Sequence, residues 1–168
     1  MSDQDAIEAV TLPLAALDVP YMAAALARWR EACAREPTAS GLTVLTMPSE
    51  RLADPLGIPG AAGYTGLIDV LRGPLDFRFR HFGADMARAI GADYTGQRVS
   101  ELRPNRYVGA LMAAYVAVAN ARAPELHRMV YRRSGRLIHY TRLLMPLSND
   151  GAKVDTIWAV THYGEGLD

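Results

Sequence analysis

The sequence predicts an α+β fold: a five-stranded antiparallel sheet covered by helices on one face, with an N-terminal helical extension. The stretch Phe77–Gly83 alternates between inward and outward residues, as a half-buried strand does. The stretch Arg106–Arg122 is apolar on most sides, which is typical of a helix that lies against a sheet. Turn residues separate three further strand-like runs, Leu126–Arg133, Leu137–Leu147 and Val154–Tyr163. Such a sheet and its helices enclose a core between them.

A second strand is predicted directly before the alternating stretch, at Leu67–Leu71. The two strands are joined by a short turn and form an antiparallel hairpin. Alternation places His81 on the same face as Phe77 and Phe79, so this histidine is expected to point inward. A short helix follows at Asp85–Ile90.

The chain divides into three parts by composition. Residues 1–40 are predicted to form the helical extension, residues 41–66 a connection rich in glycine and proline, and residues 67–168 the sheet domain. The glycines of the connection lack a Gly-x-Gly element and a lysine, so a phosphate-binding loop is not indicated. A loop that covers the domain is the expected structure there.

The helix of the extension, predicted within Leu12–Glu36, carries an apolar stripe. Met22, Leu26 and Trp29 recur at spacings of four and three residues, which places them on one helical face. This stripe suits two partners equally well, the chain's own domain or a second copy of the chain. The three residues are therefore predicted as a helix contact, and a homodimer remains open.

Composition and charge narrow the function classes. The 168 residues contain 18 basic and 18 acidic side chains, so no net positive charge draws the chain to nucleic acid or to a membrane surface. The one cysteine, Cys33, excludes an internal disulfide and fits a reducing compartment. The first residues do not follow the order of a secretory signal, and no stretch has the length of a membrane span. A cytoplasmic location is expected.

Four local stretches are characteristic in sequence: Asp69–Arg80 with Gly83, Gly91–Arg98, Arg142–Gly151, and the pair Trp29–Arg30 in the preceding helix. In these stretches the chain resembles a bacterial PAS-domain family that is found largely as short stand-alone proteins. The resemblance implies that the five-stranded antiparallel sheet is PAS-like. The resemblance implies sensing or signalling through an unidentified signalling partner and transfers no catalytic residues. It also implies that the first two strands lie beside the last three, with the long helix between the two groups.

The resemblance further implies a pocket for a small ligand between the inner face of the sheet and the long helix. The alternative for each candidate residue is an ordinary place in the core, because aromatic and methionine side chains at such spacings usually pack there. The candidates are Phe79, His81, Met86, Leu111, Tyr115, Met129, Tyr131 and Tyr140.

The cofactor remains unknown, and two cofactor modes of PAS-like proteins are disfavoured. Haem held by a histidine of the long helix needs one within Arg106–Arg122, and none is present. Photoactive flavin needs a cysteine in the short helices before it, whereas Cys33 lies far upstream. The histidines stand singly on predicted strands without the spacing of metal ligands, so no metal site is predicted.

Three functions follow, in decreasing order of support. The first is a sensory module that binds a small ligand or a protein and changes an exposed interaction surface. The second is a small cone-like α+β enzyme acting on a hydrophobic substrate, with His81 or Asp69 as acid or base; no catalytic motif supports it. Nucleic-acid binding is the third and is unlikely. This hypothesis rests on a group of arginines on the last strands, namely Arg128, Arg132, Arg133, Arg136 and Arg142. Because the net charge is zero, the preferred interpretation of the group is a strand edge exposed to solvent.

Overall fold

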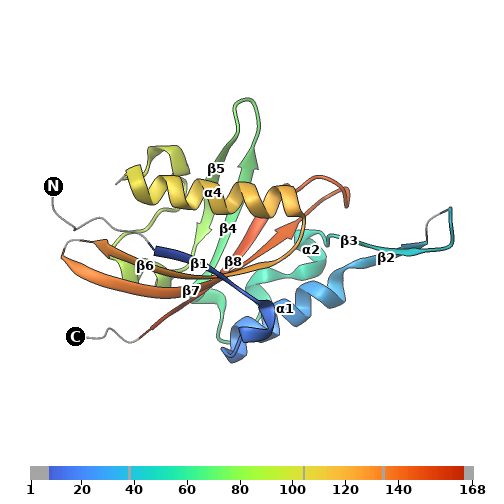
Figure 1. Cartoon of the computed structure of the whole chain (residues 1–168), viewed down its shortest axis with the longest axis horizontal. Coiled ribbons are helices and arrows are strands. Elements are labelled where there is room, and N and C mark those ends of the chain that lie inside the picture. The colour runs from blue at the N-terminus through green and yellow to red at the C-terminus, as the bar shows by residue number, and fades with distance from the viewer. Residues whose placement is uncertain (1–7, 38, 104, 134, 165–168) are drawn as a thin grey trace.

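The structure is built on a six-stranded antiparallel sheet (Figure 1). The computed structural model describes residues 8–37, 39–103, 105–133 and 135–164. Residues 1–7, which belong to the predicted extension, lie outside this description. The strands, in the order in which they lie side by side, are β1 (Glu8–Leu12), β6 (Glu125–Arg133), β7 (Arg136–Leu147), β8 (Thr156–Tyr163), β4 (Thr65–Leu71) and β5 (Asp76–Phe82).

Five of these strands are the five that the sequence predicts, and their ends differ from the prediction by one or two residues. In the sheet, β4 and β5 lie beside β8, β7 and β6, and the long helix α4 (Asn105–Ala121) stands between the two groups in the chain. Neighbouring strands pair antiparallel throughout the sheet. The predicted α+β class and strand grouping are therefore confirmed.

The sixth strand, β1, lies where the sequence predicts helical structure, so that part of the prediction is wrong. It pairs with the edge of β6, with Glu8 opposite Val130 and Leu12 opposite Leu126. Four of its five side chains are exposed, so it has no apolar alternation to reveal it. The free edge of β6 supplies the backbone partners, and this tertiary pairing is absent from any local pattern.

A small hairpin also replaces the predicted end of the extension helix. Helix α1 (Pro20–Ala32) ends before β2 (Ala34–Pro37), and β2 pairs with β3 (Thr43–Thr46) in a separate two-stranded sheet. Proline at the first turn of α1 costs little, because its missing N–H has no intrahelical partner there.

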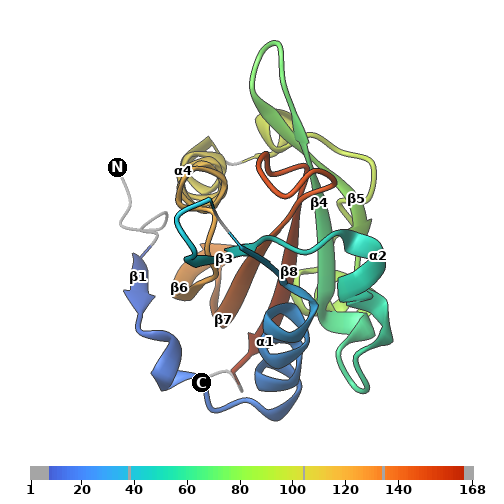
Figure 2. The ribbon, with the colours of Figure 1, turned by 90° about the vertical axis from the view of Figure 1, so that its right-hand side faces the viewer.

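Helices cover both faces of the large sheet (Figure 2). Helix α4 and the short α3 (Ala84–Ile90) lie on one face, and α1 lies on the opposite face beneath β7 and β8. The prediction of helices on one face is thus incomplete, because the extension helix packs on the second face. No helix in the described ranges combines the length and the apolar character needed to cross a membrane.

The apolar stripe of α1 packs on the chain's own sheet. Met22 is fully buried, and Leu26 and Trp29 are 5% and 8% exposed. The indole Nε1 of Trp29 donates a hydrogen bond of 2.7 Å to the carbonyl oxygen of Pro146 in β7. The sequence allows the apolar stripe of α1 to pack on the chain's own domain or on a second copy. In the structure it packs on the chain's own domain. A dimer through these side chains stays a prediction and requires α1 to leave the sheet.

The connection over residues 41–66 is more ordered than the loop that the sequence predicts. It holds β3, the short helix α2 (Glu50–Ala53) and turns of 3-10 helix at Pro55–Gly57 and Ala62–Tyr64. Arg80 of β5 donates hydrogen bonds to Glu50 of α2 and to Asp69 of β4, which fastens α2 to the sheet. Close packing also explains Gly63, because a Cβ there would lie 1.8 Å from a carboxylate oxygen of Asp85.

The packing of α1 gives the first testable prediction. Trp29→Ala leaves a cavity between α1 and β7, so the free energy of unfolding is expected to fall by about 3–5 kcal/mol. Trp29→Phe removes mainly the hydrogen bond to Pro146 and is expected to cost about 1–2 kcal/mol. Urea denaturation of both variants measures these losses. Arg30→Ala, at the exposed neighbouring position, is the control and should change stability by no more than about 0.5 kcal/mol. Equal stability of Trp29→Ala and wild type would contradict the packing.

Candidate functional site

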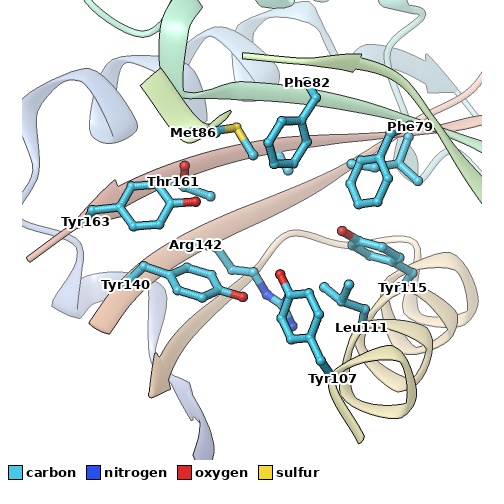
Figure 3. Close-up of a pocket in the computed structure, with 12 residues that line it drawn as sticks. Phe79, Phe82, Met86, Tyr107, Leu111, Tyr115, Tyr140, Arg142, Thr161 and Tyr163 are labelled. Carbon is cyan, nitrogen blue, oxygen red and sulfur yellow. The ribbon is translucent and has the colours of Figure 1, made fainter. Parts of the chain in front are cut away.

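A small cavity lies in the core between α4 and the inner face of the sheet (Figure 3). The space open to the centre of a water molecule is about 20 Å³, and roughly 10–15 Å³ by this measure holds one water. In this conformation the cavity therefore has room for one or two waters, and a larger ligand must displace side chains. Its lining consists of Ile68, Phe79, Phe82, Met86, Tyr107, Leu111, Tyr115, Tyr140, Arg142, Ala159, Thr161 and Tyr163.

The structure brings together most, but not all, of the residues predicted for a pocket. Those that line the cavity are Phe79, Met86, Leu111, Tyr115 and Tyr140. Those that do not are His81, Met129 and Tyr131. Met129 is fully buried on β6, opposite Tyr140, and belongs to the surrounding core. Tyr131 lies behind Tyr107, with the two rings stacked at 4.9 Å between centroids.

The expectation that His81 shares the face of Phe79 is wrong because the hairpin contains an irregularity. Phe79 pairs with Ile68 and His81 pairs with the adjacent Leu67, so one residue of β5 is left out of the register. Since neighbouring residues of β4 point to opposite faces, Phe79 and His81 do so as well. After the irregularity Phe82 takes the inward position, and it packs edge-on against Phe79 with 5.4 Å between ring centroids.

The most informative residue that the sequence analysis missed is Arg142. It was grouped with the arginines of a solvated edge, but its side chain is 3% exposed and lines the cavity. The alternation within β7 held the signal, because Arg142 stands two residues from Tyr140 and shares its face. The same two-residue alternation places Ala159, Thr161 and Tyr163 of β8 on the face that lines the cavity.

The other arginines of that group behave as the sequence predicts where they are described. The positions of Arg128, Arg132 and Arg136 are exposed. The side chain of Arg133 lies outside the described part of the structure. Positive charge on the outer edge and the buried charge of Arg142 are therefore separate features.

A chain of polar contacts fixes the guanidinium of Arg142. Its Nε donates to Nδ1 of His127 at 3.3 Å, and Nε2 of the same imidazole lies 2.9 Å from a carboxylate oxygen of Glu125. Acceptance at Nδ1 requires that the proton of a neutral ring sit on Nε2, which then donates to Glu125. The guanidinium carbon lies 5.9 Å from the ring centroid of Tyr115, within the range of a cation–π contact.

Burial and charge set the protonation of this network. Burial, with the charge of Arg142 as the second cause, lowers the pKa of His127, although hydrogen bonding and charge at Glu125 oppose the shift. The imidazole is thus held neutral at neutral pH, the state in which it accepts from Arg142. Burial also raises the pKa of the phenols of Tyr107, Tyr115 and Tyr163, so these hydroxyls stay protonated and can donate hydrogen bonds.

The polar atoms of the lining converge. Figure 3 shows phenol hydroxyls directed from α4 and from the two central strands toward the same space, namely those of Tyr107, Tyr115, Tyr140 and Tyr163. Arg142 is the one charged side chain in the lining. The residues that the structure describes contain no group of three or more His, Cys, Asp or Glu side chains that could hold a metal ion.

Comparison of the chain with models of protein families, with curated proteins and with solved structures gave no match. The site is therefore interpreted from its own geometry.

The His127 network gives a prediction about pH. The unfolded imidazole has a pKa near 6.5 and the folded one a lower value, so the unfolded chain binds the proton more readily. The free energy of unfolding is expected to fall as the pH is lowered through about 6.5. Urea denaturation between pH 7.5 and pH 5.5, conditions chosen to span that value, should show a smaller fall for His127→Gln than for wild type.

A second variant separates His127 from the rest of the protein. Glu125→Gln removes the carboxylate that favours the imidazolium, so the loss of stability with falling pH should be steeper than in wild type. Identical pH dependence in wild type and in both variants would show that this histidine does not govern it.

Proposed function

We propose that this chain is a PAS-like sensory module that binds a small molecule in the cavity beneath α4 and signals through a protein partner. The observation that carries the proposal is an incompletely filled, polar-lined space between the long helix and the sheet. Aromatic walls with a few convergent polar groups are typical of small-molecule sites. The strand order, with β4 and β5 beside the last three strands, supports the resemblance to the bacterial PAS family. Membership of that family and a cytoplasmic location stay predictions.

The signal would pass through the sheet to α1. Thr161 of β8 lines the cavity, and its backbone oxygen accepts a hydrogen bond of 2.7 Å from the hydroxyl of Tyr21, in the first turn of α1. At the other end of α1, Trp29 donates to the backbone of β7. Both ends of the helix are therefore bonded to strands that also form the wall of the cavity.

The mechanism is a shift of populations between two arrangements of α1. A ligand that spreads α4 from the sheet also moves β7 and β8, and it favours whichever position of α1 fits the moved strands. Release of α1 exposes Met22, Leu26 and Trp29, which then form a new surface for a protein partner or a second copy. This step is how a chain without a catalytic motif transmits a signal.

A small enzyme of cone-like architecture has less support. Neither of its candidate acids or bases reaches the cavity: His81 points away from it, and Asp69 lies on the opposite face of the sheet. There the carboxylate of Asp69 accepts a hydrogen bond from Arg80 at 3.0 Å, which is a structural role.

Native mass spectrometry of protein purified from its own host tests the proposal. Wild type is expected to carry a bound small molecule that is lost on denaturation. Ala159→Leu places a larger side chain in the cavity and should abolish this added mass, at a cost of about 1–3 kcal/mol of stability. Ala113→Leu makes the same change at an exposed position of α4 and should retain the ligand.

Two results would contradict the proposal. One is a folded wild type with no bound mass under all purification conditions. The other is a bound mass that Ala159→Leu retains as fully as Ala113→Leu, since the ligand then lies elsewhere.

A further inference from the structure

The chemical class of the ligand can be inferred from the charge that the cavity contains. Arg142 is 3% exposed, and no carboxylate in the described part of the chain lies within salt-bridge distance of its guanidinium. A guanidinium stays protonated in proteins. A buried charge without an opposite charge destabilises the folded state. Among the described residues, the guanidinium of Arg142 therefore has no anionic partner.

The existing contacts compensate this charge only in part. His127 accepts from Nε as a neutral ring, and the carboxylate of Glu125 is separated from the guanidinium by that ring. The contact with Tyr115 is a weak attraction to the ring face. No hydrogen bond from the two terminal nitrogens of Arg142 to a described residue is observed. These contacts orient the guanidinium and leave its outer edge for a ligand.

The rest of the lining favours an acceptor-rich ligand. The phenols of Tyr107, Tyr115 and Tyr163 are protonated donors, and none of the described residues that line the cavity is acidic. A ligand with oxygen acceptors and one negative charge would satisfy both the donors and the guanidinium. Flat aromatic walls at Phe79, Phe82 and Tyr115 suit a planar group better than a tetrahedral one.

We propose that the cavity binds a small organic monocarboxylate, with the carboxylate paired to Arg142. This inference rests on the proposed function, because it assigns a ligand class to the same cavity. The single positive charge of the guanidinium balances the single negative charge of a monocarboxylate. Its parallel N–H groups can also donate two hydrogen bonds to the two oxygens of the planar carboxylate. The water-sized space fits the carboxylate group itself, and the body of the acid takes the place of side chains that move.

Two matched pairs of probes test the inference: acetate against acetamide, and benzoate against benzamide. Each pair has one shape and differs in charge. NMR titration of the isotope-labelled full chain measures the dissociation constants and follows the side-chain Nε–H of Arg142. Each acid that binds is expected to do so at least about tenfold more tightly than its amide, because a hydrogen bond to a charged group contributes more than a neutral one.

Variants of the arginine complete the test. Arg142→Met keeps the length and removes the charge, and replacement of a buried charge by an apolar side chain is often neutral for stability. It should lose the preference for acid over amide. Arg142→Lys keeps the charge without the paired donors and should bind the acids more weakly than wild type. Arg128→Met removes an exposed arginine from the neighbouring strand and should leave the dissociation constants unchanged.

The outcomes separate this inference from the proposed function. Equal binding of acid and amide, or tighter binding of inorganic phosphate than of acetate, would overturn the carboxylate and leave a ligand-binding cavity. Acid binding that survives in Arg142→Met would overturn the role of the arginine. If no acid binds wild type, the inference is wrong, and the mass spectrometry described above then decides whether the cavity holds another ligand.

Discussion

The placement of one buried positive charge governs the inner half of this molecule. Arg142 sits in β7, a central strand, and contacts His127 on β6 and Tyr115 on α4. The guanidinium thus adds side-chain contacts with the neighbouring strand and with the helix above the sheet. Because a charge in the core is stable only with fixed polar neighbours, the tautomer of His127 and the separation of α4 from the sheet are tied to it. Arg142 and the phenol-bearing residues Tyr107, Tyr115, Tyr140 and Tyr163 all line the cavity between α4 and the sheet.

Strands β7 and β8 form part of the cavity wall on one face of the sheet and contact α1 on the other face. In β8, Ala159 and Thr161 line the cavity, whereas the alternate residues Trp158 and Val160 are fully buried and point to the other face of the sheet. A strand cannot move on one face without moving on the other, because alternate side chains share one backbone. The side chains of Tyr21 and Trp29 donate hydrogen bonds to backbone oxygens of β8 and β7, and these bonds connect α1 to both strands. The proposed coupling between the cavity and α1 therefore needs only two strands, β7 and β8.

The sequence predicted the elements of this fold better than its site. Long elements with a regular period, such as β7 and α4, were recognised because their pattern extends over many residues. Strand β1 was missed because its exposed residues carry no pattern and its partner is distant in the chain. His81 was misplaced because one unpaired residue in β5 reverses the alternation, and local sequence does not mark that irregularity. Arg142 was misinterpreted for the opposite reason: its chemical type suggested solvent, although its position two residues from Tyr140 indicated the interior.

The burial of Arg142 indicates what role this side chain has. Burial of a charge is an unfavourable way to fill a core, and an apolar side chain of similar length would serve packing as well or better. A role in stability alone therefore does not account for Arg142, for the neutral His127 that accepts from it, or for the protonated phenols around it. A role in recognition accounts for all three, because an anion needs a fixed donor, an imidazole without competing charge, and hydroxyls that donate. The small volume of the cavity agrees with the proposed function, in which the space receives the charged end of a ligand and the rest of the ligand displaces side chains.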